Sequence, residues 1–315
     1  MEWYFVVAIV LGVLLVLVFG GARWTYNQAF YSPKNRKEDI YDIPHGKQYE
    51  ERKDFMISLI KEMSEIPFEW VEITSYDNLK LRGRYYHVRD DAPLHIEFHG
   101  YRGTAYRDFC GGNKRAREAG FNSLVVDQRA HGTSEGTCIN FGVKEKYDCV
   151  SWIEYALARF GSDLEIHLSG VSMGATTVLM ACGLNLPKNV KSVTADSPFS
   201  SPSEIIEKVC GDMGYPPKLA MPLIKLGAKC FGKLSLEGSA VEAVKHATMP
   251  ILIIHGEADK FVPCEMSKAI YESNPDKIEL HTFEGAGHGL SYIRHHEEYN
   301  ATVRAFFERV SQCVR

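Results

Sequence analysis

The 315-residue sequence lacks several features that mark specialised classes of protein. It contains no internal repeat and no low-complexity tract, which excludes solenoid architectures and long disordered tails. The 36 basic and 40 acidic side chains leave a net charge of only −4, so no basic surface for nucleic acid is predicted. The eight cysteines include no Cys-x-x-Cys pair and no metal-ligand spacing. Neither a metal site nor a disulfide framework is therefore expected.

Charge is also absent from the start of the chain. The segment from Trp3 to Ala22 has no charged side chain, and a helix of 20 residues spans about 30 Å, the thickness of a bilayer's hydrocarbon core. Tyr4 and Trp24 join Trp3 as the aromatic residues that flank such a segment at the membrane interface. The sequence predicts an N-terminal transmembrane anchor over residues 1–22.

A cleaved signal peptide is the alternative interpretation of the same segment. Gly20 and Ala22 are small residues that could form its cleavage site. However, Glu2 is the only charged side chain before the apolar run, so the positive n-region of a signal peptide is missing, and the run is longer than a usual h-region. The anchor is therefore the favoured prediction.

Basic residues follow the apolar segment. Arg23, Lys34, Arg36 and Lys37 lie within about 15 residues of its end, whereas only Glu2 and the α-amine precede it. By the positive-inside rule, this bias predicts a single-pass membrane protein whose folded domain lies in the cytoplasm. The scattered cysteines agree with that orientation, because a reducing compartment keeps them as thiols.

Two parts of the chain are distinguished beyond the anchor. Residues 23–66 predict a linker and an amphipathic helix, and residues 67–315 alternate apolar strands with helices. Continuous apolar strands that alternate with helices predict an α/β fold with a mostly parallel central sheet and helices on both faces. The expected strands are 68–74, 79–88, 93–100, 121–128, 164–172, 189–197, 249–256 and 277–285, and the expected helices include 46–66, 105–120, 143–160 and 173–184.

Reactive side chains follow several of these strands. Because the carboxyl ends of parallel strands share one edge of a sheet, Ser172, Asp259 and His288 are expected in loops at that edge. Ser172 lies between Gly170 and Gly174 at a strand-to-helix junction. The two glycines predict a tight turn, since a Cβ atom at either position would collide with the crossing strand or helix.

Five sequence stretches in a fixed order carry a family resemblance. They are "HGYRG", "DQRAHGTSEG", "GVSMG", "HGEADKFVP" and "GAGHG", within the region from about residue 70 to the C-terminus. With them the chain resembles the α/β-hydrolases, of the serine-hydrolase group that includes serine aminopeptidase-like and prolyl-oligopeptidase-like enzymes. Ala130 is a departure, because relatives usually carry glycine at that place in the second stretch.

The resemblance and the chemistry of the residues together imply a catalytic triad. Ser172 is the expected nucleophile, His288 the general base that takes its proton, and Asp259 the acid that orients the imidazole. The backbone N–H groups of Tyr101 and Met173 are the expected oxyanion hole. This mechanism implies no cofactor and no metal.

Two other carboxylates are alternatives for the triad acid. Asp196 follows an earlier strand, where some relatives place the acid, and Glu257 lies in the same loop as Asp259. Asp259 is favoured because its "HGEADKFVP" setting fits the triad-acid loop of this fold and comes one strand–helix–strand unit before His288.

An insertion of about residues 201–244 contains apolar helical runs that Pro216, Pro217 and Pro222 are expected to break. In this fold it implies a small helical lid over the active site, and an apolar lid suits an acyl chain. A cap on the edge of the sheet is an equally good interpretation, since its apolar face has to be buried in either case.

The function expected from these observations is a membrane-anchored serine hydrolase, a carboxylesterase or lipase-like enzyme. Its partners would be a small-molecule ester or acyl substrate and, through the N-terminal helix, the membrane. A peptidase or amidase of the same fold is one alternative, because ester and amide cleavage share the acyl-enzyme route. A non-catalytic binding protein that kept the fold is another, but the presence of all three triad residues disfavours it.

Overall fold

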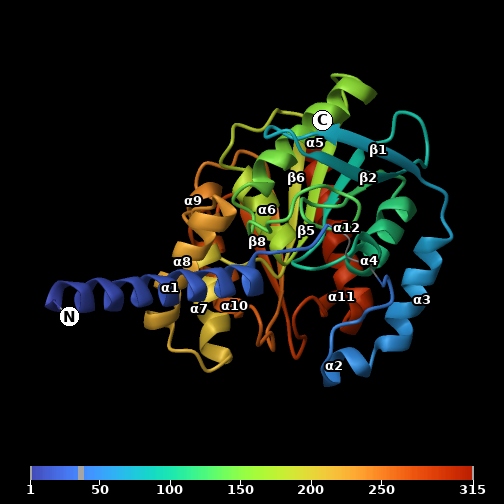
Figure 1. Cartoon of the computed structure of the whole chain (residues 1–315). Helices are drawn as coiled ribbons and strands as arrows, with labels where there is room; N and C mark the ends of the chain where they lie inside the picture. Colours follow the sequence, from blue (N-terminus) through green and yellow to red (C-terminus); the bar gives the residue numbers. More distant parts are fainter. Residues whose placement is uncertain (1, 35–38, 314–315) are drawn as a thin grey trace.

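One eight-stranded sheet forms the centre of the computed structural model, which describes residues 2–34 and 39–313 (Figure 1). The strand order is β1-β2-β4-β3-β5-β6-β7-β8; β2 is antiparallel to β1 and β4, and the other pairs are parallel. All the predicted strands are confirmed: β1 (Glu69–Thr74), β2 (Lys80–Tyr86), β3 (Leu94–Phe98), β4 (Asn122–Val126), β5 (Ile166–Val171), β6 (Val190–Asp196), β7 (Ile251–Gly256) and β8 (Ile278–Phe283).

Helices cover both faces of the sheet, as predicted (Figure 1). One face packs against α5 (Glu145–Phe160), α6 (Met173–Ala181), α9 (Ala240–Val244) and α10 (Cys264–Glu272). The other packs against α3 (Lys53–Ser64), α4 (Ala105–Glu118), α11 (Ser291–Arg294) and α12 (His296–Cys313). Trp152 of α5 and Phe306 of α12 are fully buried in these two interfaces.

The cysteines whose side chains are described are free thiols. They are Cys110, Cys138, Cys149, Cys182, Cys210, Cys230 and Cys264, and most of them are buried. Burial makes them small apolar core residues, so the sheet and its helices hold together in the described residues without disulfides. The side chain of Cys313 lies outside the described part, as do Arg36 and Lys37.

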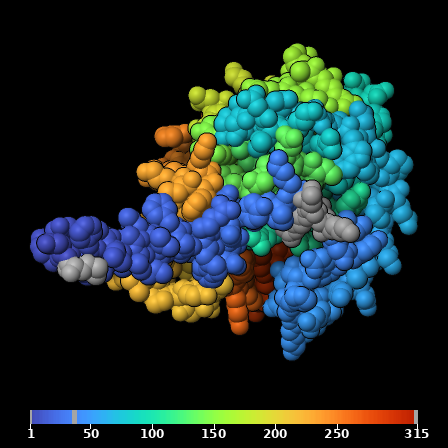
Figure 2. Space-filling view, viewed as in Figure 1, coloured from blue at the N-terminus to red at the C-terminus, as the bar shows by residue number. Residues whose placement is uncertain are grey.

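The first helix, α1 (Trp3–Ala29), projects from the body as a rod (Figures 1 and 2). Its mean hydropathy reaches 2.9 over an 18-residue window, and it is the one helix among the described residues that is long and apolar enough to cross a membrane. The side chains of its first half are exposed. The helix runs past the apolar segment to Ala29, so residues 23–29 are helical and only the residues after them can act as a linker.

The end of α1 packs against the insertion, which folds into α7 (Pro202–Asp212), α8 (Pro217–Gly232) and α9. Gly227 of α8 lies directly on the backbone of α1: a Cβ atom there would be 2.2 Å from the Ala22 carbonyl oxygen. The Thr25 hydroxyl donates to the Leu223 carbonyl oxygen at 3.3 Å. Helix α8 therefore rests on α1 through a small-residue contact.

Two further local predictions were wrong. Pro222 lies inside α8 rather than breaking it; a proline removes one backbone hydrogen bond, but the helix continues across it with its inner face buried. The helix expected over 46–66 is divided into α2 (Lys47–Glu50) and α3. The Tyr49 hydroxyl of α2 donates to the His288 carbonyl oxygen at 2.6 Å, so a tertiary contact directs this segment away from the axis of α3.

Replacement by alanine is predicted to have opposite effects on stability at Gly227, which lies in the α1–α8 contact, and at Gly211, which lies outside it. Gly227→Ala should lower the thermal unfolding midpoint of the full chain in detergent, because the new methyl group forces two backbones apart, at a typical cost of about 1–3 kcal/mol. Gly211→Ala in α7 is the matched control. Its Cβ atom has room, so the better helix propensity of alanine should raise the midpoint. Equal shifts at the two sites would contradict the observed packing.

Candidate active site

The turn between β5 and α6 holds Ser172 in a backbone conformation that few residues adopt. Its φ is 55° and its ψ is −116°, and it is the N-cap residue of α6. A Cβ atom on Gly174 would lie 1.8 Å from the Phe98 carbonyl oxygen, and one on Gly170 would lie 2.2 Å from the Gly174 carbonyl group. The predicted need for glycine on both sides of the serine is therefore confirmed.

The three residues predicted as a triad are brought together by hydrogen bonds. Ser172 Oγ lies 2.9 Å from Nε2 of His288, and His288 Nδ1 lies 2.7 Å from Oδ2 of Asp259. Asp259 follows β7, and His288 follows β8. An ionised carboxylate accepts hydrogen bonds only, so Nδ1 carries the proton in the neutral ring and Nε2 is left to accept from the serine hydroxyl. This is the arrangement that a nucleophile–base pair requires.

Asp259 is held as a carboxylate by several donors. Its Oδ1 accepts the backbone N–H groups of Phe261 at 2.9 Å and Val262 at 2.8 Å. Burial by itself would raise the pKa of Asp259, but the hydrogen bonds from His255 and His288 outweigh burial, and the pKa lies well below the usual range. The acid is therefore ionised at neutral pH and can stabilise a protonated His288.

His255 is a second histidine at the acid, and the sequence reasoning missed it. Its Nε2 lies 3.2 Å from Asp259 Oδ2 and 2.9 Å from the Val262 carbonyl oxygen, while Nδ1 lies 2.6 Å from the Ser267 hydroxyl. The ring is fully buried at the end of β7. A histidine at a strand end, four residues before the predicted acid, was the signal available in the sequence.

The alternative acids make other contacts. Asp196 accepts the Ser197 hydroxyl at Oδ1 and the Tyr299 hydroxyl at Oδ2, both at 2.9 Å, and burial raises its pKa. Glu257 accepts the Thr282 hydroxyl at 2.7 Å. Neither carboxylate is hydrogen bonded to His288 within the described residues, so the geometry favours Asp259.

The loop between β3 and α4 passes beside the serine. A Cβ atom on Gly100 would lie 3.3 Å from Cβ of Ser172, which places the next residue, Tyr101, close to the serine. The buried carboxylate of Asp108 accepts the Gly100 N–H at 2.7 Å and fixes this loop. Met173 is the first residue of α6, so its N–H has no carbonyl partner within that helix. Both backbone groups predicted for the oxyanion hole thus belong to segments that adjoin Ser172.

The end of α1 is hydrogen bonded to the same loop. The Tyr101 hydroxyl donates to the Ala29 carbonyl oxygen at 3.0 Å, and Arg102 Nη2 donates to the Gln28 carbonyl oxygen at 2.9 Å. An apolar cluster continues this contact to the insertion and to the residue after the serine; its members include Tyr26, Phe30, Phe141, Met173, Phe199, Ile205 and Ile224. Helix α1 and the insertion together therefore cover the carboxyl edge of the sheet beside Ser172.

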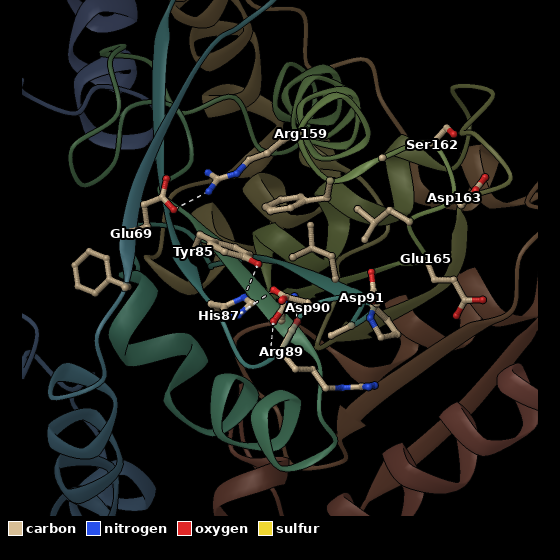
Figure 3. A pocket seen from close by; sticks show the side chains of 18 of the residues that line it. Glu69, Tyr85, His87, Arg89, Asp90, Asp91, Arg159, Ser162, Asp163 and Glu165 are labelled. Carbon is tan, nitrogen blue, oxygen red and sulfur yellow. Dashed lines mark hydrogen bonds and ion pairs between the residues drawn. The ribbon is translucent and has the colours of Figure 1, made fainter.

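A hollow of about 1170 Å³ lies at the opposite edge of the sheet (Figure 3). It is lined by Leu94, Asn122 and Glu165, which precede or begin parallel strands, whereas the triad residues follow strand ends. Arg159 on its wall is paired with Glu69 at 2.6 Å. This hollow is remote from the triad and has no part in the chemistry proposed for Ser172.

A second hollow, of about 540 Å³, lies between the sheet, α4 and α12. His95 lines it, and the neighbouring Glu97 is fully buried; His95 Nδ1 lies 3.3 Å from Glu97 Oε1. Burial raises the pKa of Glu97 to about 8 and lowers that of His95 to about 3, so both groups are neutral at moderate pH. Several buried polar atoms here have no hydrogen-bond partner in the described part of the chain, in His95, Glu97, Asn113, Ser123, Thr194 and Asn300.

Sequence comparisons agree with this fold. The profile of the alpha/beta hydrolase fold matches residues 96–220, and that of the serine aminopeptidases, S33, matches residues 236–292. The uncharacterized protein YqkD of Bacillus subtilis is 26% identical over 62% of this chain and 64% of its own length. Human protein ABHD12B is 28% identical over 64% and 58%, and the lysophosphatidylserine lipase ABHD12 of Danio rerio is 23% identical over 64% and 51%. The alignments thus span less than two thirds of these relatives.

Solved structures share the architecture. A crystal form of the esterase Pf2001 of Pyrococcus furiosus is 25% identical, with a TM-score of 0.64 over 79% of this chain and 94% of that one. Est1E of Butyrivibrio proteoclasticus with bound ferulic acid is 21% identical, with a TM-score of 0.60 over 77% and 99%. The chain belongs to the α/β-hydrolase superfamily and has its fold. The relatives that it matches include an esterase and a lipase, which supports the interpretation that this chain is a hydrolase.

The pH dependence of stability tests the burial of Glu97 beside the second hollow. Its folded pKa of about 8 lies above the unfolded value of ~4.3, so the protonated group contributes stability fully below pH ~4.3 and loses that contribution as the pH rises to about 8. Glu97→Gln stays neutral, so its unfolding midpoint relative to the parent chain should rise over this interval and level off above it. Thermal unfolding in detergent across the pH range measures the difference, with exposed Glu237→Gln as the control. A pH-independent difference would show that Glu97 is not buried as described.

Proposed function

We propose that the protein is a membrane-anchored serine hydrolase that cleaves carboxylic esters through an acyl-enzyme intermediate. The observation that carries this proposal is the continuous hydrogen-bonded chain from Ser172 Oγ through the His288 ring to the Asp259 carboxylate. A serine hydroxyl is a weak nucleophile until a neighbouring base takes its proton, and this chain supplies the base and its orienting acid.

The proposed reaction has two halves. Ser172 Oγ attacks the ester carbonyl carbon while His288 Nε2 takes the hydroxyl proton, and the carbonyl oxygen becomes an oxyanion that the Tyr101 and Met173 N–H groups stabilise. The tetrahedral intermediate collapses, the C–O bond to the alcohol breaks, and His288 returns the proton to the leaving alkoxide oxygen. Water, deprotonated by His288, then attacks the acyl-serine, and the acid product leaves with Ser172 restored.

Ester substrates are favoured by the comparisons and by the surroundings of the site. One solved relative is an esterase, another relative is a lysophosphatidylserine lipase, and the cover beside Ser172 is apolar. An apolar cover suits an acyl chain, and we propose that α7 to α9 act as its lid. Peptidase or amidase activity is the second candidate, because residues 236–292 match the serine aminopeptidase profile. A non-catalytic role is disfavoured, because a protein that only binds does not need a connected triad.

The membrane anchor and its orientation belong to the same proposal. Helix α1 has the length and hydropathy of a membrane span, and its first half projects from the body with exposed side chains. Arg23 and Lys34 follow the apolar segment on the side of the folded domain, which favours a cytoplasmic position for that domain. We propose that residues 67–315 form the catalytic domain and residues 1–22 the anchor.

The nucleophile can be tested by labelling. Ser172→Ala should abolish covalent labelling of the purified full chain by a fluorophosphonate, because Ser192 and Ser267, the other serines bonded to a histidine in the described residues, are fully buried. Ser169→Ala, on the same strand but lining the hollow beside α12, is the control and should label normally. Fluorophosphonate labelling at another serine of the Ser172→Ala protein would refute the assignment.

The acid can be tested by comparing two carboxamide variants. Asp259→Asn should lower ester turnover by about 10⁴-fold, the loss found when the same change is made in a serine-protease triad. Asp196→Asn should cost far less at equal folded fraction, since that carboxylate is bonded to Ser197 and Tyr299 instead of His288. Turnover of a chromogenic ester, with circular dichroism to establish folding, measures both. The reverse ranking would move the acid to Asp196.

A further inference from the structure

The turn between α7 and α8 and the first turn of α8 expose apolar side chains to an unusual degree. Leu219 is 73% exposed and Met213 is 61% exposed, the two highest values among large hydrophobic residues outside α1 in the described chain. Tyr215 between them is 42% exposed. A cluster of exposed apolar side chains usually marks a surface that binds a partner protein, a membrane or a ligand.

The outer face of α8 is basic. Lys218, Lys225 and Lys229 are exposed, and the helix contains no acidic residue. None of the three lysines forms an ion pair in residues 2–34 and 39–313, whereas Lys208 of α7 is paired with Asp212. The inner face of α8, with Met221, Ile224 and Ala228, is buried. Helix α8 is therefore amphipathic, with unpaired positive charge on the side away from the body.

This surface adjoins α1 at the point where the apolar segment of α1 ends. Trp24 and Tyr215 pack edge to face, with their ring centroids 6.1 Å apart. Gly227 lies against the carbonyl group of Ala22 on α1. Tryptophan and tyrosine are enriched at the depth of lipid headgroups, so this aromatic pair marks the level of a membrane interface if α1 spans the bilayer.

We propose that Met213, Tyr215, Leu219 and the three lysines, here called the α8 patch, form a second membrane contact that binds the anionic surface of the bilayer that α1 crosses. The lysines face lipid phosphates, and the apolar side chains enter the upper acyl region, as in interfacial amphipathic helices. The inference rests on the proposed anchoring by α1 and is independent of the proposed hydrolysis.

A bilayer is favoured over a protein partner by two observations. The patch is continuous with the exposed apolar surface of α1, so any membrane that surrounds α1 is already next to it. Its charge is of one sign, and Arg23 beside it adds to that charge, which matches the anionic lipid of a cytoplasmic leaflet. The contact would hold the helices that cover Ser172 against the membrane.

The test places a photo-crosslinking residue in the full-length protein in lipid nanodiscs. Benzoylphenylalanine replaces Leu219, and lipid adducts are measured by mass spectrometry in nanodiscs of phosphatidylcholine with and without phosphatidylglycerol. The same probe at Leu14 of α1 reports insertion of the anchor. At Val88, an exposed apolar residue just after β2, it reports random collision with lipid. We expect adducts at Leu14 in both lipids, severalfold more adducts at Leu219 with phosphatidylglycerol than without it, and only background at Val88.

Charge reversal supplies the matched control for the lysines. The combined change Lys218→Glu, Lys225→Glu and Lys229→Glu should remove the phosphatidylglycerol dependence of the Leu219 adduct. Reversal of Lys47, Lys53 and Lys61, three exposed lysines of α2 and α3, should leave that dependence unchanged. Fluorophosphonate labelling of both variants in detergent shows that they are folded.

Three results would overturn the proposal. Adducts at Leu14 without adducts at Leu219 would mean that α1 is anchored but the α8 patch stays off the bilayer. If the adduct yield at Leu219 changes neither with phosphatidylglycerol nor with the charge reversal, the lysines do not bind anionic lipid. Absence of adducts at Leu14 would refute the anchor and this inference together, while fluorophosphonate labelling of Ser172 would still report the proposed hydrolysis separately.

Discussion

The close contact between the first turn of α6 and the neighbouring strands sets the position of the whole site. Gly174 touches the backbone of β3, and Gly170 touches the backbone of α6, so no side chain can separate the helix from the sheet. Ser172 is thereby kept at a positive φ, a conformation that costs of order 1–3 kcal/mol and persists only where the surroundings impose it. The buried residues of α6 supply that support, and its N-terminus points its free N–H groups to the edge where the serine lies.

The charge of Asp259 is the second constraint, because a buried carboxylate is stable only with enough donors. Two backbone N–H groups, His255 and His288 provide them. These donors come from β7 with the loop after it and from the loop after β8, so the pairing of the last two strands determines the acid–base geometry. The carboxylate in turn fixes the tautomer of His288, which leaves Nε2 facing the serine hydroxyl.

The sequence predicted the parts that depend on local pattern. Buried parallel strands are continuous apolar runs, and the residues after them converge on one edge, so the sheet and the placement of Ser172, Asp259 and His288 at that edge were predictable. The preference for Asp259 over Asp196 and Glu257 came from the resemblance of its loop to the triad-acid loop of the family. Contacts that join distant segments were not predictable. Residues 23–29 are of mixed polarity and were interpreted as linker, yet packing against α8 keeps them helical. Glu97 shares β3 with His95, and both polar side chains are buried although polar and apolar residues alternate along this strand.

The length of α1 connects the apolar N-terminal segment to the candidate active site. A helix leaves the carbonyl groups of its last turn without partners in the helix, and these must be satisfied by other donors. Because α1 ends at Ala29 and not at Ala22, those carbonyl groups reach the β3–α4 loop, where Tyr101 and Arg102 donate to them. The loop proposed to stabilise the oxyanion is thus fixed on one side by Asp108 and on the other by the end of α1. Any restraint on the orientation of α1 therefore also restrains this loop, so the end of α1 is a structural part of the site.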